Sequence, residues 1–280
     1  NNKLYKSIKI NDLIKGKIAE GIFSFVKKIN TNSYILARDK YGVKKLFYTF
    51  KNHKIVYADN FIDLKKRTNS SKIFSLSPGY YMIYDKVKKT KTFKKIKFNK
   101  KIPNLSALNI VRAINNFFLL LKKNNNNSCI VLLSGGLDST IIAYLAKKVF
   151  KNTIAITCVF LSKKDFEDYK RTKKIDSKKF HDFNNAKKIS NKIGLKFVPL
   201  VLPIEVVKND LIKTMYCIQD WRDFNVHCGS LNYQIAKYIK TNYSKKIPIF
   251  TGDFMNELFA DYTSEFVDGK EYYKQLEVSK

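Results

Sequence analysis

The sequence SGGLDS, residues 134–139, combines two glycines with two serines and an aspartate. It follows the apolar run 128–133 and precedes an amphipathic run that begins at Ser139. Glycines let a backbone turn tightly and approach a ligand without interference from a Cβ atom. The N-terminus of a helix presents free N–H groups to an anion. The pattern predicts a phosphate-binding loop between a buried strand and a helix.

The polar side chains of this loop suit a nucleotide better than a bare phosphate. Ser134, Ser139 and Thr140 offer hydroxyl donors. Asp138 would repel a bare phosphate but suits the Mg²⁺ that accompanies a nucleotide pyrophosphate. The loop lacks the lysine of the GxxxxGK[ST] motif, which disfavours a P-loop kinase or GTPase. A turn that only joins strand to helix would not need these side chains, so we expect ATP and Mg²⁺ as cofactors.

Strand and helix alternate in the part of the chain that must position this loop. Apolar residues recur every three or four positions from Leu108 to Leu121, which predicts a helix. Strands are expected at 128–133, 153–161, 196–202 and 247–250, and helices at 139–150, 182–193, 204–215 and 228–243. This order predicts an α/β fold with a doubly wound parallel sheet. Such sheets bind ligands outside the carboxyl ends of their strands, where Ser134 and Gly252 would lie.

The first part of the chain is predicted to be β-rich. Strands are expected at 21–28, 32–39, 44–50, 53–60 and 79–86. The lysine-rich segment 86–105 is interpreted as a connector that ends near a proline. We therefore predict two domains, 1–103 and 104–280.

The formal net charge of +31 arises from 54 Lys and Arg against 23 Asp and Glu. An excess of this kind is typical of proteins that bind RNA or DNA, but it also arises from a biased composition. The basic residues are spread along the chain and Lys predominates over Arg. A nucleic-acid footprint is clustered and favours Arg, so we do not expect a nucleic-acid partner.

Four cysteines stand apart without a CxxC pair. They are interpreted as reduced, and Cys129 and Cys158 as core residues, which favours a cytoplasmic protein without disulfides. No run of about 18 apolar residues predicts a membrane span. The chain has no initiator Met, and we expect it to be a fragment of a longer protein. A homodimer is allowed, since oligomeric state is invisible in the sequence.

A resemblance to a known family adds to this reading. SGGLDS resembles the pyrophosphate loop of the N-type ATP pyrophosphatases, in the form found in the glutamine-dependent asparagine synthetase family. Other similar segments are EGIFSFVKK (20–28), LARDKYGVKKLFY (36–48), YADNF (57–61), SLSPGYYMIYD (75–85), KKFHDFNNAKKISNKIGLKFVPL (178–200) and IFTGDFMNELFADY (249–262). The resemblance implies that 1–103 is the C-terminal half of a class II (Ntn-type) glutamine amidotransferase domain, without its nucleophilic cysteine. It implies that 104–280 is a C-terminally incomplete ATP-pyrophosphatase domain.

The resemblance also implies a reaction, in which ATP activates a carboxylate as an acyl-adenylate and ammonia, glutamine-derived nitrogen or another amine then attacks. The carboxylate would be aspartate-like. In this family the pyrophosphate and metal would be held by the loop, the adenine would lie against two strands, and the acyl group would face a second loop. The loop residues that match are Ser134, Gly135, Gly136, Asp138, Ser139 and Thr140. The matching residues beside the adenine are Leu132 and Val159, and those that face the acyl group are Gly252 and Asp253.

The chain departs from the family pattern at two positions of that second loop. Asp253 replaces a glutamate, so the carboxylate is kept but its reach is shorter. Asn256 replaces a metal-binding aspartate, which should weaken metal affinity. The next residue, Glu257, is a candidate to compensate and, with Asp253, a candidate catalytic residue.

The segment 218–233 is unusually rich in functional groups around the sole tryptophan. Arg222 and Asp223 are candidates to bind the substrate, with Arg222 pairing with a carboxylate. The alternative is a polar loop that caps the next helix through Asp223 or Asn225. Similarly, Asp182 after His181 is interpreted as a helix N-cap rather than as part of a catalytic pair.

Two other functions remain open. A different acid or amine could be used, as in the β-lactam synthetases, or the chain could be a non-catalytic, basic nucleic-acid-binding relative. The intact SGGLDS loop speaks against loss of the site. The sequence names neither the acid nor the nitrogen donor.

Overall fold

The computed structural model describes residues 9–15, 21–97, 106–123, 127–219, 223–243 and 247–253. The chain divides into two compact units, Asn1–Pro103 and Asn104–Lys280. The kind of domain that each unit represents remains a prediction.

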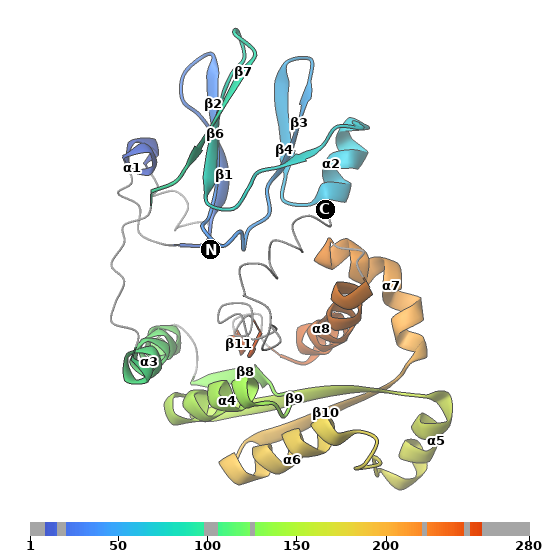
Figure 1. The fold of residues 1–280 in the computed structure, drawn as a ribbon. Coiled ribbons are helices and arrows are strands. Elements are labelled where there is room, and N and C mark those ends of the chain that lie inside the picture. The colour runs from blue at the N-terminus through green and yellow to red at the C-terminus, as the bar shows by residue number, and fades with distance from the viewer. Residues whose placement is uncertain are drawn as a thin grey trace, which may run out of the picture. The chain divides into compact units, whose positions relative to one another are not determined.

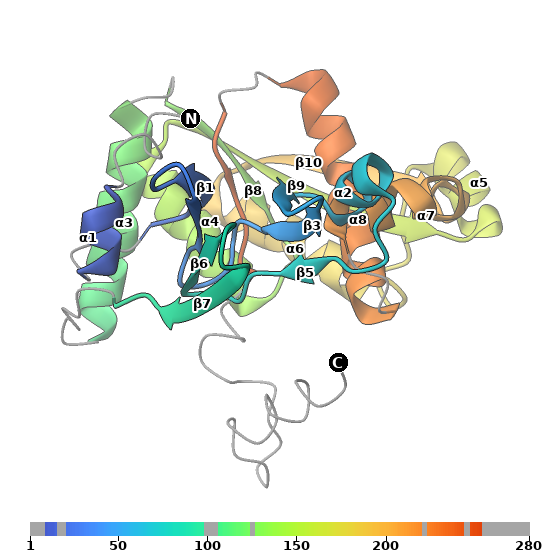
Figure 2. The same cartoon turned by 90° about the horizontal axis from the view of Figure 1, so that it is seen from above.

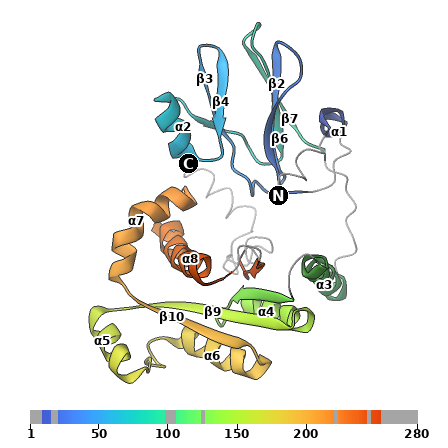
Figure 3. The same ribbon diagram turned by 180° about the vertical axis from the view of Figure 1, so that it is seen from behind.

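The first unit contains two antiparallel sheets, which Figures 1 and 3 show as separate groups of strands. One sheet has the order β1-β2-β6-β7 and the other the order β4-β3-β5. The strands are β1 (Ser24–Lys28), β2 (Ser33–Arg38), β3 (Phe47–Lys51), β4 (Lys54–Ala58), β5 (Phe74–Ser75), β6 (Tyr80–Asp85) and β7 (Thr90–Lys95). Two helices accompany them, α1 (Ile10–Ile14) and α2 (Phe61–Thr68).

Strand β2 forms the centre of this unit because its alternate side chains are buried on both faces. Leu36 packs with Tyr48 and Met82 in one apolar cluster. Ile35 and Ala37 point the other way and pack with Leu13 of α1 in a second cluster. The two clusters follow from the period of two in a strand.

The corner after β2 is fixed by two buried charges. The Asp39 carboxylate is fully buried and accepts backbone N–H bonds from Tyr41, Val43 and Lys44, each at 3.1 Å. The neighbouring Arg38 donates to the carbonyl oxygens of Gly42 at 2.7 Å and of Lys44 and Leu76 at 2.8 Å. This part of the family-like segment 36–48 therefore has a structural role.

All five strands predicted in this unit are confirmed, with shifted ends. The interpretation of 86–105 as a connector is wrong for residues 90–95, which form β7 and pair with β6. Every residue of β7 is exposed, so its lysines stay in solvent and carry no desolvation penalty. Lysines are common on edge strands of this kind. Helix α2 was not predicted either; Asn60 caps it by accepting the N–H groups of Ile62 and Asp63.

The second unit is built on a parallel sheet with the order β10-β9-β8-β11. Its strands are β8 (Ser128–Leu132), β9 (Asn152–Leu161), β10 (Lys196–Pro203) and β11 (Ile249–Phe250). Figure 2 shows β8, β9 and β10 side by side. The chain builds outward from β8 to β10 and then returns to add β11 on the other side of β8. The strand order therefore reverses between β8 and β11, and this is where doubly wound sheets bind ligands.

Helices cover both faces of this sheet. They are α3 (Ala107–Lys123), α4 (Leu137–Val149), α5 (Lys163–Thr172), α6 (His181–Ile193), α7 (Glu205–Ile218) and α8 (Asp223–Asn242). Cys129 and Val131 of β8 pack with residues of α3, α4 and α6. Ile130 points to the opposite face and packs with Ile235 and Ile239 of α8. Figure 1 shows α6 and α8 on opposite sides of the strands.

These observations confirm the predicted α/β fold with a doubly wound parallel sheet. Helix α5 was not predicted, because only two of its residues, Phe166 and Tyr169, pack against the core and none is fully buried. Two apolar positions are too few to indicate a helix by their spacing. The buried thiols of Cys129 and Cys158 confirm their prediction as core residues, and no described cysteine is in a disulfide. Within the described ranges, no helix has the length and apolar character needed to cross a bilayer.

Candidate functional site

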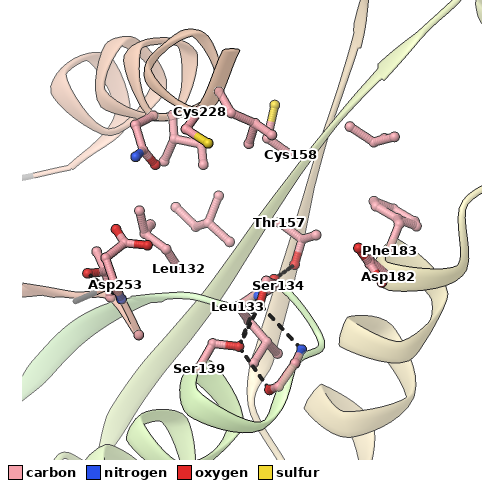
Figure 4. A pocket seen from close by; sticks show the side chains of 18 of the residues that line it. Leu132, Leu133, Ser134, Ser139, Thr157, Cys158, Asp182, Phe183, Cys228 and Asp253 are labelled. Atoms are coloured by element: carbon pink, nitrogen blue, oxygen red, sulfur yellow. Dashed lines mark hydrogen bonds between the residues drawn. The ribbon is translucent and has the colours of Figure 1, made fainter. Parts of the chain in front are cut away.

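A cleft of about 1050 Å³ opens in the second unit at the carboxyl ends of β8, β9 and β11. Its walls come from the glycine loop, β9, the first turn of α6, one side of α8 and the residues after β11. Figure 4 shows Ser134 and Ser139 at its base, with Asp253 on one side of them and Asp182 on the other. The cleft therefore gathers segments that are far apart in the sequence.

The glycine loop is held in shape by its own hydroxyl groups. The Oγ atoms of Ser134 and Ser139 lie 2.9 Å apart, and Ser139 Oγ also accepts the Ser134 N–H at 3.2 Å. Ser139 Oγ donates to the Gly136 carbonyl at 3.2 Å, and Thr140 Oγ1 donates to the same oxygen at 2.6 Å. From β9, Thr157 Oγ1 donates to the Leu133 carbonyl at 2.6 Å. These bonds preorganise the backbone of the loop.

The N-terminus of α4 points its free N–H groups toward the cleft side of this loop. Gly136 occupies the N-cap position with an extended backbone, φ −80° and ψ 170°, and no described side chain caps the helix. The first N–H groups of a helix have no intrahelical partner and carry a partial positive charge. This geometry suits the binding of an anion, and the anion site itself stays a prediction.

Gly252, after β11, lies directly against the start of α4. A Cβ atom at this position would lie 2.7 Å from the Ser139 nitrogen and 3.0 Å from the carbonyl carbon of Asp138. Both of these are backbone atoms, so only glycine permits the approach. The second loop thus meets the glycine loop at the point where the strand order reverses.

The start of α6 meets the glycine loop from the other side. Gly135 has φ +91°, and a Cβ atom there would lie 2.6 Å from the Asp182 carbonyl oxygen and 2.9 Å from the Ala186 nitrogen. The position therefore requires glycine both for its backbone conformation and for the close packing of α6. Two helix N-termini converge on one loop as a result.

The interpretation of Asp182 as the N-cap of α6 is wrong. The helix begins one residue earlier, at His181, with Phe180 in the N-cap position and no side-chain cap. The Phe180 N–H is bonded to the Asp176 carbonyl at 3.0 Å, so a preceding turn sets the start of the helix. The Asp182 side chain is 92% exposed and its Oδ1 lies 3.9 Å from His181 Nδ1. Both side chains line the cleft.

Strand β9 supplies a free backbone edge above the loop. The Leu133 N–H is bonded to the Ile156 carbonyl at 3.0 Å, and β8 pairs with β9 only as far as Leu132 and Ile156. Alternate residues of a strand direct their N–H and C=O groups to the same edge. Cys158 therefore presents its backbone groups on the edge that β8 has left, and no described strand pairs with that edge beyond Ile156.

Helix α8 forms the wall opposite the loop. Its cleft-lining residues include Asn225, Cys228 and Asn232, which are three and four residues apart and lie on one face of the helix. Asn225 is the third residue of α8, so it is not the helix cap that one interpretation assigned to it. Lys179 was not predicted as a cleft residue, whereas His227 and Asn232 belong to the segment 218–233 that the sequence marks as rich in functional groups. The i, i+3, i+7 pattern of polar residues could have indicated Asn232.

The structure brings together eight of the residues predicted for the site. Those that line the cleft are Leu132, Ser134, Gly136, Asp138, Ser139, Val159, Gly252 and Asp253. Gly135 lies in the loop but faces α6, and Thr140 bonds to Gly136 without lining the cleft. Asp223 begins α8 and is not a lining residue. Arg222, Asn256 and Glu257 lie outside the described residues.

Two carboxylates of the cleft fit a magnesium site that is completed by phosphate oxygens. Asp138 is in the first turn of α4, and Asp253 follows the glycine that packs on that turn. Mg²⁺ in nucleotide sites is usually bound by one or two carboxylates together with phosphates and waters. Among the described residues, no three or more His, Cys, Asp or Glu side chains form a group that could hold a metal ion.

Comparison with solved structures finds weak similarity. The NH3-dependent NAD synthetase from Campylobacter jejuni subsp. jejuni NCTC 11168, in complex with the nitrate ion, has a TM-score of 0.38 and 16% identity over 57% of this chain and 62% of that chain. The NMN synthetase from Francisella tularensis has a TM-score of 0.37 and 14% identity over 58% of this chain and 61% of that one. The glutamine-dependent NAD+ synthetase from Acinetobacter baumannii, in complex with ADP, has a TM-score of 0.36 and 12% identity over 70% of this chain and 33% of that one. The chain spans less than two thirds of each of these proteins, and the similarity is too low to carry an argument.

Comparison with protein families gives a more extensive match. No curated protein matches the chain. The asparagine synthase family model matches residues 125–272, which is more than half of the chain and includes the whole cleft from the glycine loop to Asp253. The chain therefore belongs to the asparagine synthase family.

Proposed function

We propose that this protein is an ATP-dependent amide ligase that forms AMP and pyrophosphate. It would activate a carboxylate by adenylation and then transfer ammonia or an amine to the acyl group. The observation that carries the proposal is the backbone contact of Gly252 with Asp138 and Ser139. This contact brings the two loops together at the reversal of strand order, where doubly wound sheets usually bind ligands.

The nucleotide would lie across the carboxyl ends of β8 and β9. Its phosphates would accept hydrogen bonds from the N–H groups at the start of α4, which no described side chain occupies. Its adenine would lie above Leu132 and Val159, against the free backbone edge at Cys158. Backbone donors and acceptors on that edge match the hydrogen-bonding edge of a purine.

The first step would join the substrate to the nucleotide. A carboxylate oxygen attacks the α-phosphorus, a new O–P bond forms, and the bond to the β-phosphate oxygen breaks as pyrophosphate leaves. The N–H groups of the loop are fixed in place before this happens, since Ser134, Ser139 and Thr157 already hold the backbone. Preorganised donors stabilise developing charge without the cost of reorganisation.

The second step would release AMP. The nitrogen of ammonia or an amine attacks the acyl carbon, loses a proton, and the C–O bond to AMP breaks. Asp253 lies beside Gly252 at the side of the cleft where the acyl group would sit, and its carboxylate could accept that proton. Asp138 would hold Mg²⁺ together with phosphate oxygens, with Asn256 as the other predicted ligand, and the ion would neutralise charge on the departing pyrophosphate.

The substrate would lie against the wall that α8 forms. The wall on α8 offers the amides of Asn225 and Asn232 and the imidazole of His227. Arg222 and Glu257 stay predicted contributors. An aspartate-like acid and a glutamine-derived nitrogen are the expected substrates, and a β-lactam-synthetase-like variant is the main alternative. The amidotransferase character of residues 1–103, the cytoplasmic location and a homodimer also stay predictions.

The proposal is tested by pyrophosphate release from ATP and Mg²⁺ across a panel of carboxylic acids, beginning with aspartate and with ammonia present. Release that depends on one acid and is lost in Asp138→Ala supports adenylation of that acid. Asp168→Ala is the matched control, because Asp168 is an exposed residue of α5 paired with Arg171 at 2.9 Å and does not line the cleft. Absence of release with every acid from folded protein would contradict the ligase proposal, and absence of ATP binding as well would also remove the nucleotide site. Salt-sensitive RNA binding by the same protein would then favour the non-catalytic alternative.

A further inference from the structure

Lys179 is a charged residue of the cleft that the resemblance does not assign. Of the described residues that line the cleft, it is the one lysine, and none is an arginine. The same walls carry the carboxylates of Asp138, Asp182 and Asp253. These three carboxylates would repel the negative charges of a bound polyphosphate. The ammonium group of Lys179 would offset that repulsion, which makes it important for binding.

The backbone around Lys179 is anchored at the mouth of the glycine loop. Its N–H and the N–H of Lys178 donate to Asp176 Oδ1 at 3.4 and 2.8 Å. Phe180 packs in the apolar cluster formed with Phe183 and Leu161. Three residues after Lys179, the Asp182 carbonyl packs on Gly135. A span of three residues is at most about 10 Å, and Lys179 lines the same cleft as the loop, so its side chain is near enough to meet a phosphate chain that extends from the loop.

The ammonium group of Lys179 already has a partner at the edge of the cleft. It forms an ion pair with Asp165, in the first turn of α5. Asp165 is itself fixed by Ser162 Oγ, which donates to its Oδ2 at 2.7 Å. The Lys179 hydrogen bond, followed by the one from Ser162, lowers the pKa of Asp165. Figure 3 shows α5 and α6, which flank this pair, on the same side of β9 and β10.

We propose that Lys179 binds the β- and γ-phosphates of the nucleotide and that Asp165 holds its ammonium group at the edge of the cleft until the nucleotide arrives. Half of the lysine side chain is exposed, so exchanging the carboxylate for a phosphate requires only side-chain rotation. The inference rests on the proposed nucleotide site but not on the identity of the acid. It makes Lys179 a binding residue for the leaving pyrophosphate.

The test is calorimetric binding of ATP, pyrophosphate and AMP, each with Mg²⁺ and at fixed ionic strength. In Lys179→Gln, we expect about tenfold weaker binding of ATP and pyrophosphate, with AMP binding changed less than about twofold. Lys179→Arg keeps the charge and should restore most of the affinity. Lys178→Gln is the matched control, because this neighbouring lysine does not line the cleft.

Asp165→Asn separates a phosphate contact from a structural ion pair. It frees the ammonium group, so ATP should bind as tightly as in the unsubstituted protein or more tightly. Equal weakening in Lys179→Gln and Asp165→Asn would overturn the proposal and show a structural pair. Unchanged pyrophosphate binding in Lys179→Gln, or an equal loss of AMP binding, would also overturn it.

The same measurements distinguish this inference from the proposed function. If the unsubstituted protein binds ATP in the predicted Lys179-dependent way but releases no pyrophosphate with any acid, the ligase proposal fails and the assignment of Lys179 stands. If the protein binds neither ATP nor pyrophosphate, both are overturned.

Discussion

Replacing Gly252 by alanine tests whether the contact between the two loops builds the nucleotide site. The added methyl would lie 2.7 Å from the Ser139 nitrogen and 3.0 Å from both the Asp138 carbonyl carbon and the Ser139 Cα. All three are backbone atoms of α4, so no flexible side chain can move aside. Overpacking of this kind costs about 1–3 kcal/mol. Relief of the clash must separate the second loop from the N-terminus of α4.

The expected magnitude follows from that strain. If most of this strain energy is released by displacement of the two loops, the affinity for ATP should fall between about fivefold and about 150-fold, since 1.4 kcal/mol corresponds to a tenfold change in the dissociation constant. The melting temperature should fall by a few degrees, at about 2–4 °C per kcal/mol for a domain of this size. Calorimetric titration of ATP and thermal unfolding measure the two effects.

Gly194→Ala provides the matched control. Gly194 ends α6 with φ +74°, and a Cβ atom there would meet no heavy atom within 4 Å. Its replacement should cost about 1 kcal/mol of stability through backbone strain alone and leave ATP binding unchanged. Equal ATP affinity in Gly252→Ala and Gly194→Ala, at similar melting temperatures, would refute the reasoning that the loop contact forms the site.

Three further predictions follow from the structure. Gly135→Ala, with φ +91° and a Cβ atom 2.6 Å from the Asp182 carbonyl oxygen, should push α6 off the loop and weaken pyrophosphate binding by at least about tenfold; binding within twofold of normal would contradict the packing. Asp210 of α7 accepts hydrogen bonds from two residues of α8, Lys237 at 2.6 Å and Gln234 at 3.0 Å. The bond from Lys237, and to a smaller extent the bond from Gln234, holds the pKa of Asp210 well below its usual range. Because folding lowers the pKa of Asp210, its contribution to the free energy of unfolding is present above the unfolded pKa of about 3.9 and is lost as the pH falls toward the folded pKa. Asp210→Asn should therefore lower the free energy of unfolding at pH 7 by about 2 kcal/mol. In urea unfolding measured over a series of pH values, the variant should also lose less stability toward acid pH, and an unchanged loss would contradict this. Burial raises the pKa of Cys129 to about 11 and that of Cys158 to about 12, so a maleimide at pH 7 should label only the exposed Cys228 and Cys217; ATP should protect Cys228, which lines the cleft, but not Cys217, and equal protection of both would place the nucleotide elsewhere.

Much of the candidate site could be predicted because its signals are local. The glycine loop, the strand before it and the helix after it are contiguous, so the residues themselves specify a turn with a helix N-terminus. The hydroxyls of Ser134 and Ser139 were expected to donate to a ligand, whereas they bond to each other and to the loop backbone. Their role toward a phosphate stays a prediction, and their structural role is observed.

Lys179 could not be predicted because nothing near it in the chain marks it as a cleft residue, and for His227 the sequence indicated only the segment 218–233 in which it lies. Lys179 is one of many lysines in a lysine-rich chain, and its position depends on the turn held by Asp176 and on the ion pair with Asp165. His227 lies on the cleft side of α8 only because the helix packs its Ile235 side on β8 and β9. The edge strand β7 was missed for a related reason, since lysines obscure its alternation.

The sequence by itself determined the alternation of the sheet strands with most of their helices in the second unit, five strands of the first unit and the chemistry of the SGGLDS loop, because periodicity and glycine conformation are properties of short segments. It did not reveal α2, α5 or β7. Only the tertiary structure decided that β11 pairs with β8 rather than with β10, which brings Gly252 onto the backbone of Ser139. Strand pairing is set by the burial of apolar faces between distant segments, and no local pattern specifies which edge of a sheet the last strand will join. The site depends on that pairing, because it is the reversal between β8 and β11 that opens the cleft at their carboxyl ends.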